Sequence, residues 1–289
     1  MDEVGVRRPP AVLLGLARAA LLEDVGRGDV TSLITIAEET RARARFVARE
    51  ELVVSGLEAA RAVFFEAGGE EANFVGLASE GDLLAAGSVL IEVEGPARPI
   101  LAAERVALNF LMRLSGIANL TKRYVEAVAG TGVRITDTRK TTPGLRLLEK
   151  AAARAGGGTN HRAGLDVGVL IKDNHLALAG GVTEAVRRAR ANSPHLLKVE
   201  VEVESLQMLE EAIRAGADVV LLDNMTPEEV REAVGMARRE APGLLVEVSG
   251  RVELQTVRSY AEAGPDLISV GALTHSAPAA DISLEVEPS

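Results

Sequence analysis

Basic residues are concentrated between Arg134 and Lys172 in a chain of 289 residues that is acidic overall. This stretch holds eight lysines and arginines together with His161, against three acidic residues, whereas the whole chain has a formal net charge of -10. Lysine and arginine hold carboxylates and phosphates by charge-assisted hydrogen bonds. The local reversal of sign therefore predicts a site for an anionic ligand.

Valine and glutamate alternate from Val199 to Glu204. Because successive side chains of a strand point to opposite faces, the valines share one face and the glutamates the other. One interpretation is a half-solvated antiparallel strand. In a parallel barrel the glutamates would instead point inward, where each needs a lysine, an arginine or a metal ion. With Asp223 at the end of the next predicted strand, Glu202 could hold Mg2+ beside a phosphorylated substrate.

Small residues follow the last two predicted strands, as Ser249-Gly250 and Gly271-Ala272. Small side chains let backbone N–H groups approach an anion, and the loops after the final strands of barrels often bind phosphate. A single glycine after a strand is more often only a turn. The two pairs together favour a phosphate site.

Alternating strands and helices in the second half of the chain must position these residues. Apolar runs predict strands at 133–136, 167–171, 196–203, 219–222, 244–248 and 267–270. Helical periodicity appears between several of them, at 183–191, 205–215 and 227–239. This order is typical of a parallel (β/α) barrel, whose chemistry lies at the carboxyl ends of its strands. Six strands instead of eight predict an irregular barrel.

The first half reads as a small α+β unit. It contains a predicted amphipathic helix at 10–23 and predicted strands at 43–50, 52–55, 73–77 and 88–93. A long helix from Ile100 is expected to break at Ser115-Gly116. We therefore expect an α/β chain with one domain at 1–114 and a barrel at 115–275. The tail, 276–289, has the alternation of a strand and is expected to pack back on the first domain.

Composition excludes several classes of protein. The chain has no cysteine, so disulfides, thiolate catalysis and cysteine-bound metals are excluded, and a reducing compartment such as the cytoplasm is expected. Five Phe, two Tyr and no Trp, in an acidic chain, argue against nucleic-acid binding. The apolar run from Ala11 is broken by Arg18, so neither a signal peptide nor a membrane span is expected.

Six motifs, in order along the chain, resemble the quinolinate phosphoribosyltransferase family. They are Thr138–Arg146, Asn160–Arg162, Ile171–His175, Glu200–Val203, Leu222–Asn224 and Gly271–Ser276. The resemblance extends over nearly the whole chain. It implies an N-terminal open-faced sandwich, an irregular (β/α) barrel and a homodimer whose active site is shared between subunits.

The resemblance also implies a reaction. Quinolinate and 5-phosphoribosyl 1-pyrophosphate would give nicotinate mononucleotide, pyrophosphate and CO2, a step of de novo NAD biosynthesis, with Mg2+ and no organic cofactor. The quinolinate carboxylates are assigned to Arg139, His161, Arg162 and Lys172, joined by Arg105 from the partner subunit. The other assigned substrate contacts are Thr138, Ser249, Gly250, Gly271 and Ala272. Lys140, Lys172, Glu202 and Asp223 are assigned to catalysis, and the last two also to the metal ion.

Three alternatives remain open. Lys172 could be the nucleophile of a Schiff-base aldolase. The barrel could bind a sugar phosphate without catalysis, or transfer the phosphoribosyl group to nicotinate, although the surplus of cations favours two substrate carboxylates.

Several basic side chains have no clear assignment from the sequence. Arg146, Lys150 and Arg154 follow a helical spacing and are expected to decorate a helix face instead of binding substrate. Arg251 stands where the family often has a glycine. His175 and His275 lie within family motifs without a required role.

Overall fold

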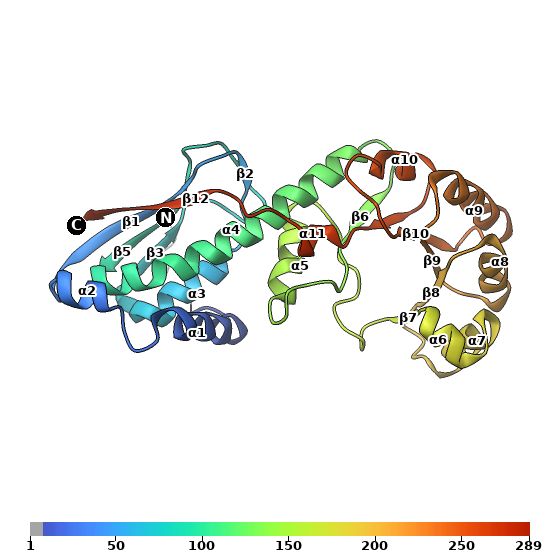
Figure 1. Cartoon of the computed structure of the whole chain (residues 1–289), viewed down its shortest axis with the longest axis horizontal. Helices are drawn as coiled ribbons and strands as arrows, with labels where there is room; N and C mark the ends of the chain where they lie inside the picture. Colours follow the sequence, from blue (N-terminus) through green and yellow to red (C-terminus); the bar gives the residue numbers. More distant parts are fainter. Residues whose placement is uncertain (1–7) are drawn as a thin grey trace. The chain divides into compact units, whose positions relative to one another are not determined.

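The computed structural model describes residues 8–289, which fold into two compact units (Figure 1). The first unit comprises the described residues of Met1–Leu120 together with Arg154–Gly156 and Ala277–Ser289. The second unit comprises Thr121–Ala153 and Gly157–Ser276. Among the described helices, none has the length and apolar character needed to cross a membrane.

The first unit contains an antiparallel sheet with the strand order β12-β1-β5-β3. Its strands are β1 (Arg41–Ala48), β3 (Asn73–Gly76), β5 (Val89–Pro96) and β12 (Ile282–Pro288). The alternating apolar residues of the tail place Leu284 of β12 opposite Phe46 of β1. A separate short pair consists of β2 (Leu52–Val53) and β4 (Leu83–Leu84).

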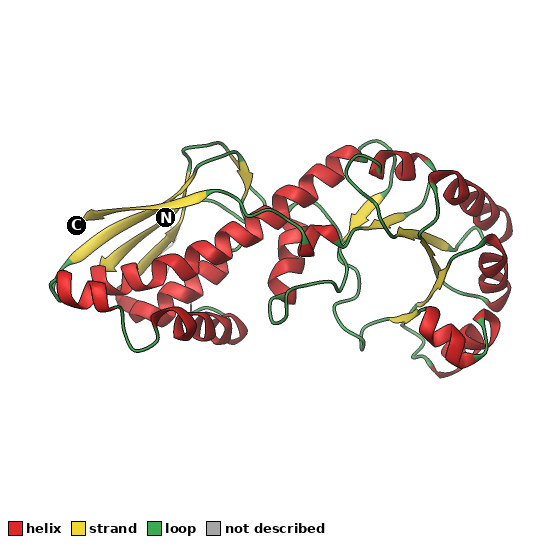
Figure 2. Ribbon diagram, in the orientation of Figure 1, coloured by secondary structure: helices red, strands yellow, loops and turns green. Residues whose placement is uncertain are grey.

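Helices cover one face of this sheet (Figure 2). They are α1 (Ala11–Val25), α2 (Val30–Thr35), α3 (Leu57–Gly68), the 3-10 turn Gly69–Glu71 and the first part of α4 (Ala97–Ala127). Phe64 of α3 meets Phe46 of β1 edge to face, with ring centroids 5.7 Å apart. Exposed ion pairs such as Arg43 with Glu94, at 3.2 Å, link neighbouring strands of the sheet. The expected open-faced sandwich is confirmed.

The helix α4 does not break at Ser115-Gly116, so that prediction is wrong. Ser115 is fully buried, and its hydroxyl accepts the N–H of Ser55 at 3.0 Å and donates to the carbonyl of Ser55 at 3.2 Å. A Cβ atom at Gly116 would lie 2.0 Å from the carbonyl oxygen of Pro278. These small residues allow close packing inside a continuous helix of 31 residues.

The second unit is built on six parallel strands in the order β6-β11-β10-β9-β8-β7. They are β6 (Arg134–Thr136), β7 (Val169–Ile171), β8 (Val199–Val203), β9 (Val219–Asp223), β10 (Leu245–Ser249) and β11 (Leu267–Ser269). Each lies within or next to a strand predicted from the sequence. The strands β6 and β7 lie at opposite ends of the sheet, and no pairing joins them among the described residues, so the barrel is open.

Helices lie outside the curved sheet of the second unit (Figure 2). They are α5 (Arg146–Ala155), α6 (Asp173–Ala179), α7 (Val182–Asn192), α8 (Leu206–Ala215), α9 (Pro227–Glu240), α10 (Val257–Glu262) and α11 (Ala272–His275). The three helices predicted between strands are confirmed as α7, α8 and α9. At the free edge of β6, Thr159 forms an isolated parallel bridge with Thr136, which brings the glycine-rich segment beside the strand.

Candidate active site

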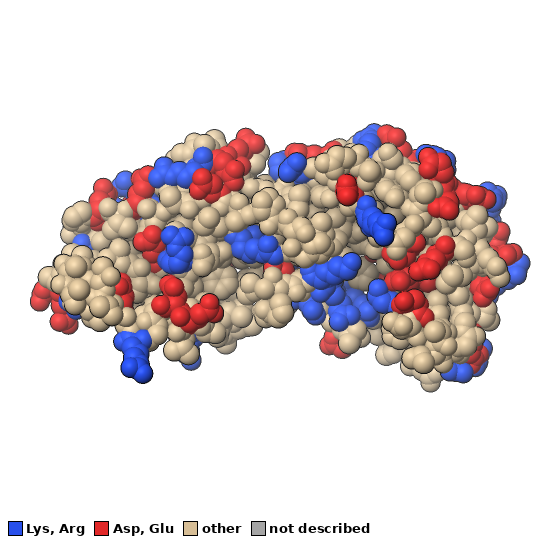
Figure 3. Space-filling model, in the orientation of Figure 1, with Lys and Arg blue, Asp and Glu red and all other residues tan. Residues whose placement is uncertain are grey.

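A cavity of about 680 Å³ opens at the carboxyl ends of the parallel strands. Twelve of the residues predicted from the sequence line it: Thr138, Arg139, Lys140, His161, Arg162, Lys172, Glu202, Asp223, Ser249, Gly250, Gly271 and Ala272. Parallel strands end at one edge of a sheet, so residues far apart in the sequence meet there. In Figure 3 basic side chains gather on one side of a hollow in this unit and acidic side chains on the other.

Arg139 and Arg162 form the cationic side of the cavity. The Nε atom of each is buried and has no hydrogen-bond acceptor among the described residues. Arg162 donates from Nη1 to the carbonyl of Gly168 at 2.8 Å. Burial lowers the pKa of Arg162, and the charge of Arg139 lowers it further. Two neighbouring guanidinium groups with unused N–H donors can bind an anion by charge-assisted hydrogen bonds.

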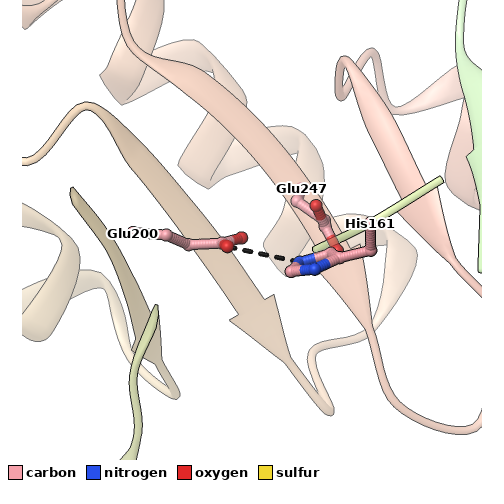
Figure 4. A group of neighbouring side chains, drawn as sticks. All are labelled: His161, Glu200 and Glu247. Atoms are coloured by element: carbon pink, nitrogen blue, oxygen red, sulfur yellow. Dashed lines mark ion pairs between the residues drawn. The ribbon is translucent and has the colours of Figure 1, made fainter. Parts of the chain in front are cut away.

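His161 lines the cavity and lies close to two buried carboxylates, Glu200 and Glu247 (Figure 4). Its Nε2 atom is 3.3 Å from Glu200 and 3.6 Å from Glu247. Burial lowers the pKa of His161, but the hydrogen bond to Glu200 and the charge of Glu247 raise it more, for a net increase. Burial and the charge of Glu200 raise the pKa of Glu247 to about 7.

The other ring nitrogen of His161 limits what this cluster can bind. In the neutral ring, Nδ1 accepts the backbone N–H of Arg162 at 2.8 Å and carries no proton. The proton of the neutral ring is then on Nε2, which faces Glu200 as a donor. Although His161, Glu200 and Glu247 are close enough to hold a metal ion, the ring offers no lone pair toward it.

The acidic side of the cavity is built around Glu202 and Asp223. Lys172 donates to Glu202 at 2.9 Å, so the inward glutamate has the cationic partner that the alternating pattern required. Burial raises the pKa of Asp223, and the charge of Glu202 raises it further, against the opposing effect of Lys172. Oxygens of Glu202, Glu204 and Asp223 lie within 4.8 Å of one another. Crowded carboxylates of this kind fit a magnesium ion.

Two glycines of the cavity wall lie so close to neighbouring side chains that a Cβ atom would crowd them. A Cβ atom at Gly250, where φ is +89°, would lie 2.4 Å from Oδ1 of Asn224. A Cβ atom at Gly271 would lie 3.0 Å from Cδ of Lys140. Arg251, next to Gly250, also lines the cavity and has a φ of 30°, a left-handed conformation that favours glycine.

Comparison with known proteins agrees with this arrangement. Residues 29–115 match the N-terminal domain of quinolinate phosphoribosyl transferase, and residues 117–285 match its C-terminal domain. The chain belongs to this family.

Relatives of this chain match nearly its whole length. A probable nicotinate-nucleotide pyrophosphorylase (carboxylating) of Bacillus subtilis is 42% identical over 265 residues, which is 92% of this chain and 90% of the relative. The Homo sapiens protein named nicotinate-nucleotide pyrophosphorylase (carboxylating) is 40% identical over 280 residues, 96% of this chain and 93% of the relative. The structure of the Francisella tularensis nicotinate-nucleotide pyrophosphorylase has a TM-score of 0.90 at 37% identity and covers 99% of this chain and 100% of that one.

Several buried polar residues of the second unit could not all be predicted from the sequence. Lys150 does not decorate a helix face, because only 3% of it is exposed and it pairs with the fully buried Asp137. Glu247 lies on β10, where the alternation of Val246 and Val248 around it repeats the pattern of β8 and was a usable signal. Asp137 and Lys150 carried no such signal, because their pairing depends on the fold.

Three other predicted residues have defined places. Arg105 lies exposed on α4 in the first unit, so its contribution to the site of a neighbouring subunit stays a prediction. His175 accepts the backbone N–H of Lys172 at 2.9 Å and caps α6. His275 lines the cavity and lies 2.6 Å from the hydroxyl of Ser276.

Proposed function

We propose that this chain converts quinolinate and 5-phosphoribosyl 1-pyrophosphate to nicotinate mononucleotide, pyrophosphate and CO2, in de novo NAD biosynthesis. The observation that carries the proposal is one cavity with two unpaired buried guanidinium donors on one side and crowded carboxylates on the other. Quinolinate has two carboxylates for the first side. The ribose of 5-phosphoribosyl 1-pyrophosphate and its metal ion fit the carboxylates of the acidic side.

The quinolinate subsite is assigned to Arg139, His161, Arg162 and Lys172. Arginine pairs bidentately with a carboxylate because its donors form a planar fork. Both arginines line the cavity, where their guanidinium groups can donate to the substrate carboxylates. Arg105 of a neighbouring subunit is assigned to the same ligand, which makes the homodimer the proposed working form.

The phosphoribosyl subsite is assigned to the remaining cavity residues. Lys140 and Lys172 face its phosphates, and Glu202 and Asp223 face its ribose and metal ion. Backbone N–H groups near the small residues are assigned to a phosphate, with a further contact from the hydroxyl of Thr138; the small residues are Ser249, Gly250, Gly271 and Ala272. Glu202 and Asp223 fit Mg2+, which when bound supplies positive charge to the leaving pyrophosphate.

The chemistry requires a positive charge to develop twice. Departure of pyrophosphate leaves an oxocarbenium-like ribose, and the carboxylates of Glu202 and Asp223 stabilise that charge. The pyridine nitrogen attacks the ribose and becomes cationic. That cationic nitrogen then stabilises the electron pair left at C2 when the C2 carboxylate leaves as CO2, and a proton adds at C2 to give nicotinate mononucleotide. Decarboxylation therefore needs no organic cofactor. Because its substrates and products are small anionic metabolites, we place the enzyme in the cytoplasm.

The aldolase alternative is less well supported. A Schiff-base lysine attacks as a free amine. Nζ of Lys172 instead lies 2.9 Å from a carboxylate oxygen of Glu202, an ion pair that such a nucleophile would have to give up. The non-catalytic barrel gives no account of the opposed cationic and acidic sides of one cavity.

The proposal is tested by following pyrophosphate release from 5-phosphoribosyl 1-pyrophosphate in the purified protein. Release should require both quinolinate and Mg2+, and borohydride should trap no carbonyl compound on Lys172. Pyrophosphate release without quinolinate, or a trapped Lys172 adduct, would count against the proposed reaction.

A further inference from the structure

The helix α5 contacts both segments that carry the two arginines of the cavity. Arg146 and Lys150 are four residues apart, so they lie on the same face of this helix. Arg139 lies in the segment that follows β6, and Arg162 lies in the segment that bridges the free edge of β6. Neither segment is a regular element, so other contacts must fix the position of each arginine.

Arg146 links the two segments directly. Its Nε atom donates at 3.0 Å to the hydroxyl of Thr141, two residues after Arg139 in the same segment. Its Nη1 atom donates to the carbonyl of Ala163 at 3.1 Å, directly after Arg162. One guanidinium group thus joins the segment that contains Arg139 to the segment that contains Arg162.

Lys150 makes a second, buried link one helical turn later. Its ammonium group pairs with the carboxylate of Asp137 and donates to the carbonyl of His161 at 2.9 Å. Asp137, which directly follows β6, in turn accepts the backbone N–H of His161 at 2.9 Å. The backbone N–H and the carbonyl of His161 are therefore both held by this ion pair, immediately before Arg162.

A third residue of α5 holds the far end of the first segment. Glu149 is fully buried and accepts the backbone N–H of Thr142 at 3.0 Å and its hydroxyl at 2.8 Å. Arg139 and Arg162 carry like charges that repel each other. The contacts from α5 are therefore needed to keep the two arginines close together.

We propose that α5 is the positioning element that sets the spacing of Arg139 and Arg162, and that Arg146 thereby determines the preference for two carboxylates over one. This inference rests on the proposed function. A ligand with two carboxylates depends on the distance between the two guanidinium groups, whereas a single carboxylate can follow either group alone. Small displacements of a binding group have large effects on a rigid ligand.

The test compares Arg146→Gln with the parent protein. Titration should show quinolinate binding weakened by about tenfold or more, because charge-assisted links are lost. Nicotinate binding and the KM for 5-phosphoribosyl 1-pyrophosphate should change by less than about threefold. Arg146→Lys, which keeps the charge and one donor group, should restore part of the preference for quinolinate.

Arg214→Gln is the matched control, because Arg214 is exposed on α8 and pairs with Glu210 of the same helix. It should behave like the parent protein. Equal losses for quinolinate and nicotinate, or no loss in a folded Arg146→Gln protein, would overturn the inference. If Arg146→Gln does not fold, the ratio of the two affinities in Arg146→Lys decides. Failure of the proposed function would instead appear in the parent protein, as no turnover of quinolinate.

Discussion

Arg162 has one guanidinium nitrogen fixed by the protein and another without an acceptor. Arg162→Ala should therefore weaken quinolinate binding by about 10- to 100-fold, the range for a lost hydrogen bond between charged groups. The affinity for 5-phosphoribosyl 1-pyrophosphate should change little. Separate binding titrations of the two substrates check this prediction, and equal losses for both would contradict the carboxylate assignment.

Glu247 should make stability depend on pH. Its pKa is raised to about 7, chiefly by burial and by Glu200, while His161 opposes the shift. A carboxyl group with a raised pKa stabilises the fold below its ordinary value of 4.5, and this contribution is lost as the pH rises through about 7.

Glu247→Gln cannot release a proton and should lack this dependence. Between about pH 5 and pH 8, the free energy of unfolding of the parent should fall relative to that of the variant, by up to about 3 kcal/mol. Urea unfolding at a series of pH values measures the difference. Parallel curves for the two proteins would show that Glu247 has no raised pKa.

At the scale of elements, glycine has opposite effects in two helices. Gly116→Ala in α4 should destabilise the protein by at least about 1–3 kcal/mol, because the added methyl group would overlap the carbonyl of Pro278. Gly15→Ala in α1 is the matched control. It has open space around the added atom and should stabilise the protein by about 0.5–1 kcal/mol. Thermal unfolding distinguishes them, and a neutral Gly116→Ala would refute the packing account.

The barrel strands could be predicted because each is a short apolar run with polar or small residues at its carboxyl end. That same pattern placed Lys172, Glu202 and Asp223 in one site. The break expected at Ser115-Gly116 was wrong because local propensity favours a stop there, while packing against Ser55 and Pro278 keeps the helix continuous. Buried partners that depend on tertiary contacts, such as Lys150 and Asp137, could not be predicted from periodicity.

For the whole molecule, the shared site makes a prediction about mixed assemblies. Arg105→Ala and Lys172→Ala should each be inactive alone, because each removes one part of every site. Mixed dimers should regain some activity, since one of their two sites would contain both native residues. Activity assays after confirmed subunit exchange test this, and no recovery would argue against a site built from two chains.

The central claim is that phosphoribosyl transfer is coupled to loss of one carboxylate. The most direct measurement supplies the protein with quinolinate, 5-phosphoribosyl 1-pyrophosphate and Mg2+, with nicotinate as a competing substrate, and follows CO2 and nicotinate mononucleotide together. We predict equal amounts of both products, formed from quinolinate. Nicotinate mononucleotide formed without CO2, from nicotinate in preference to quinolinate, would contradict the claim.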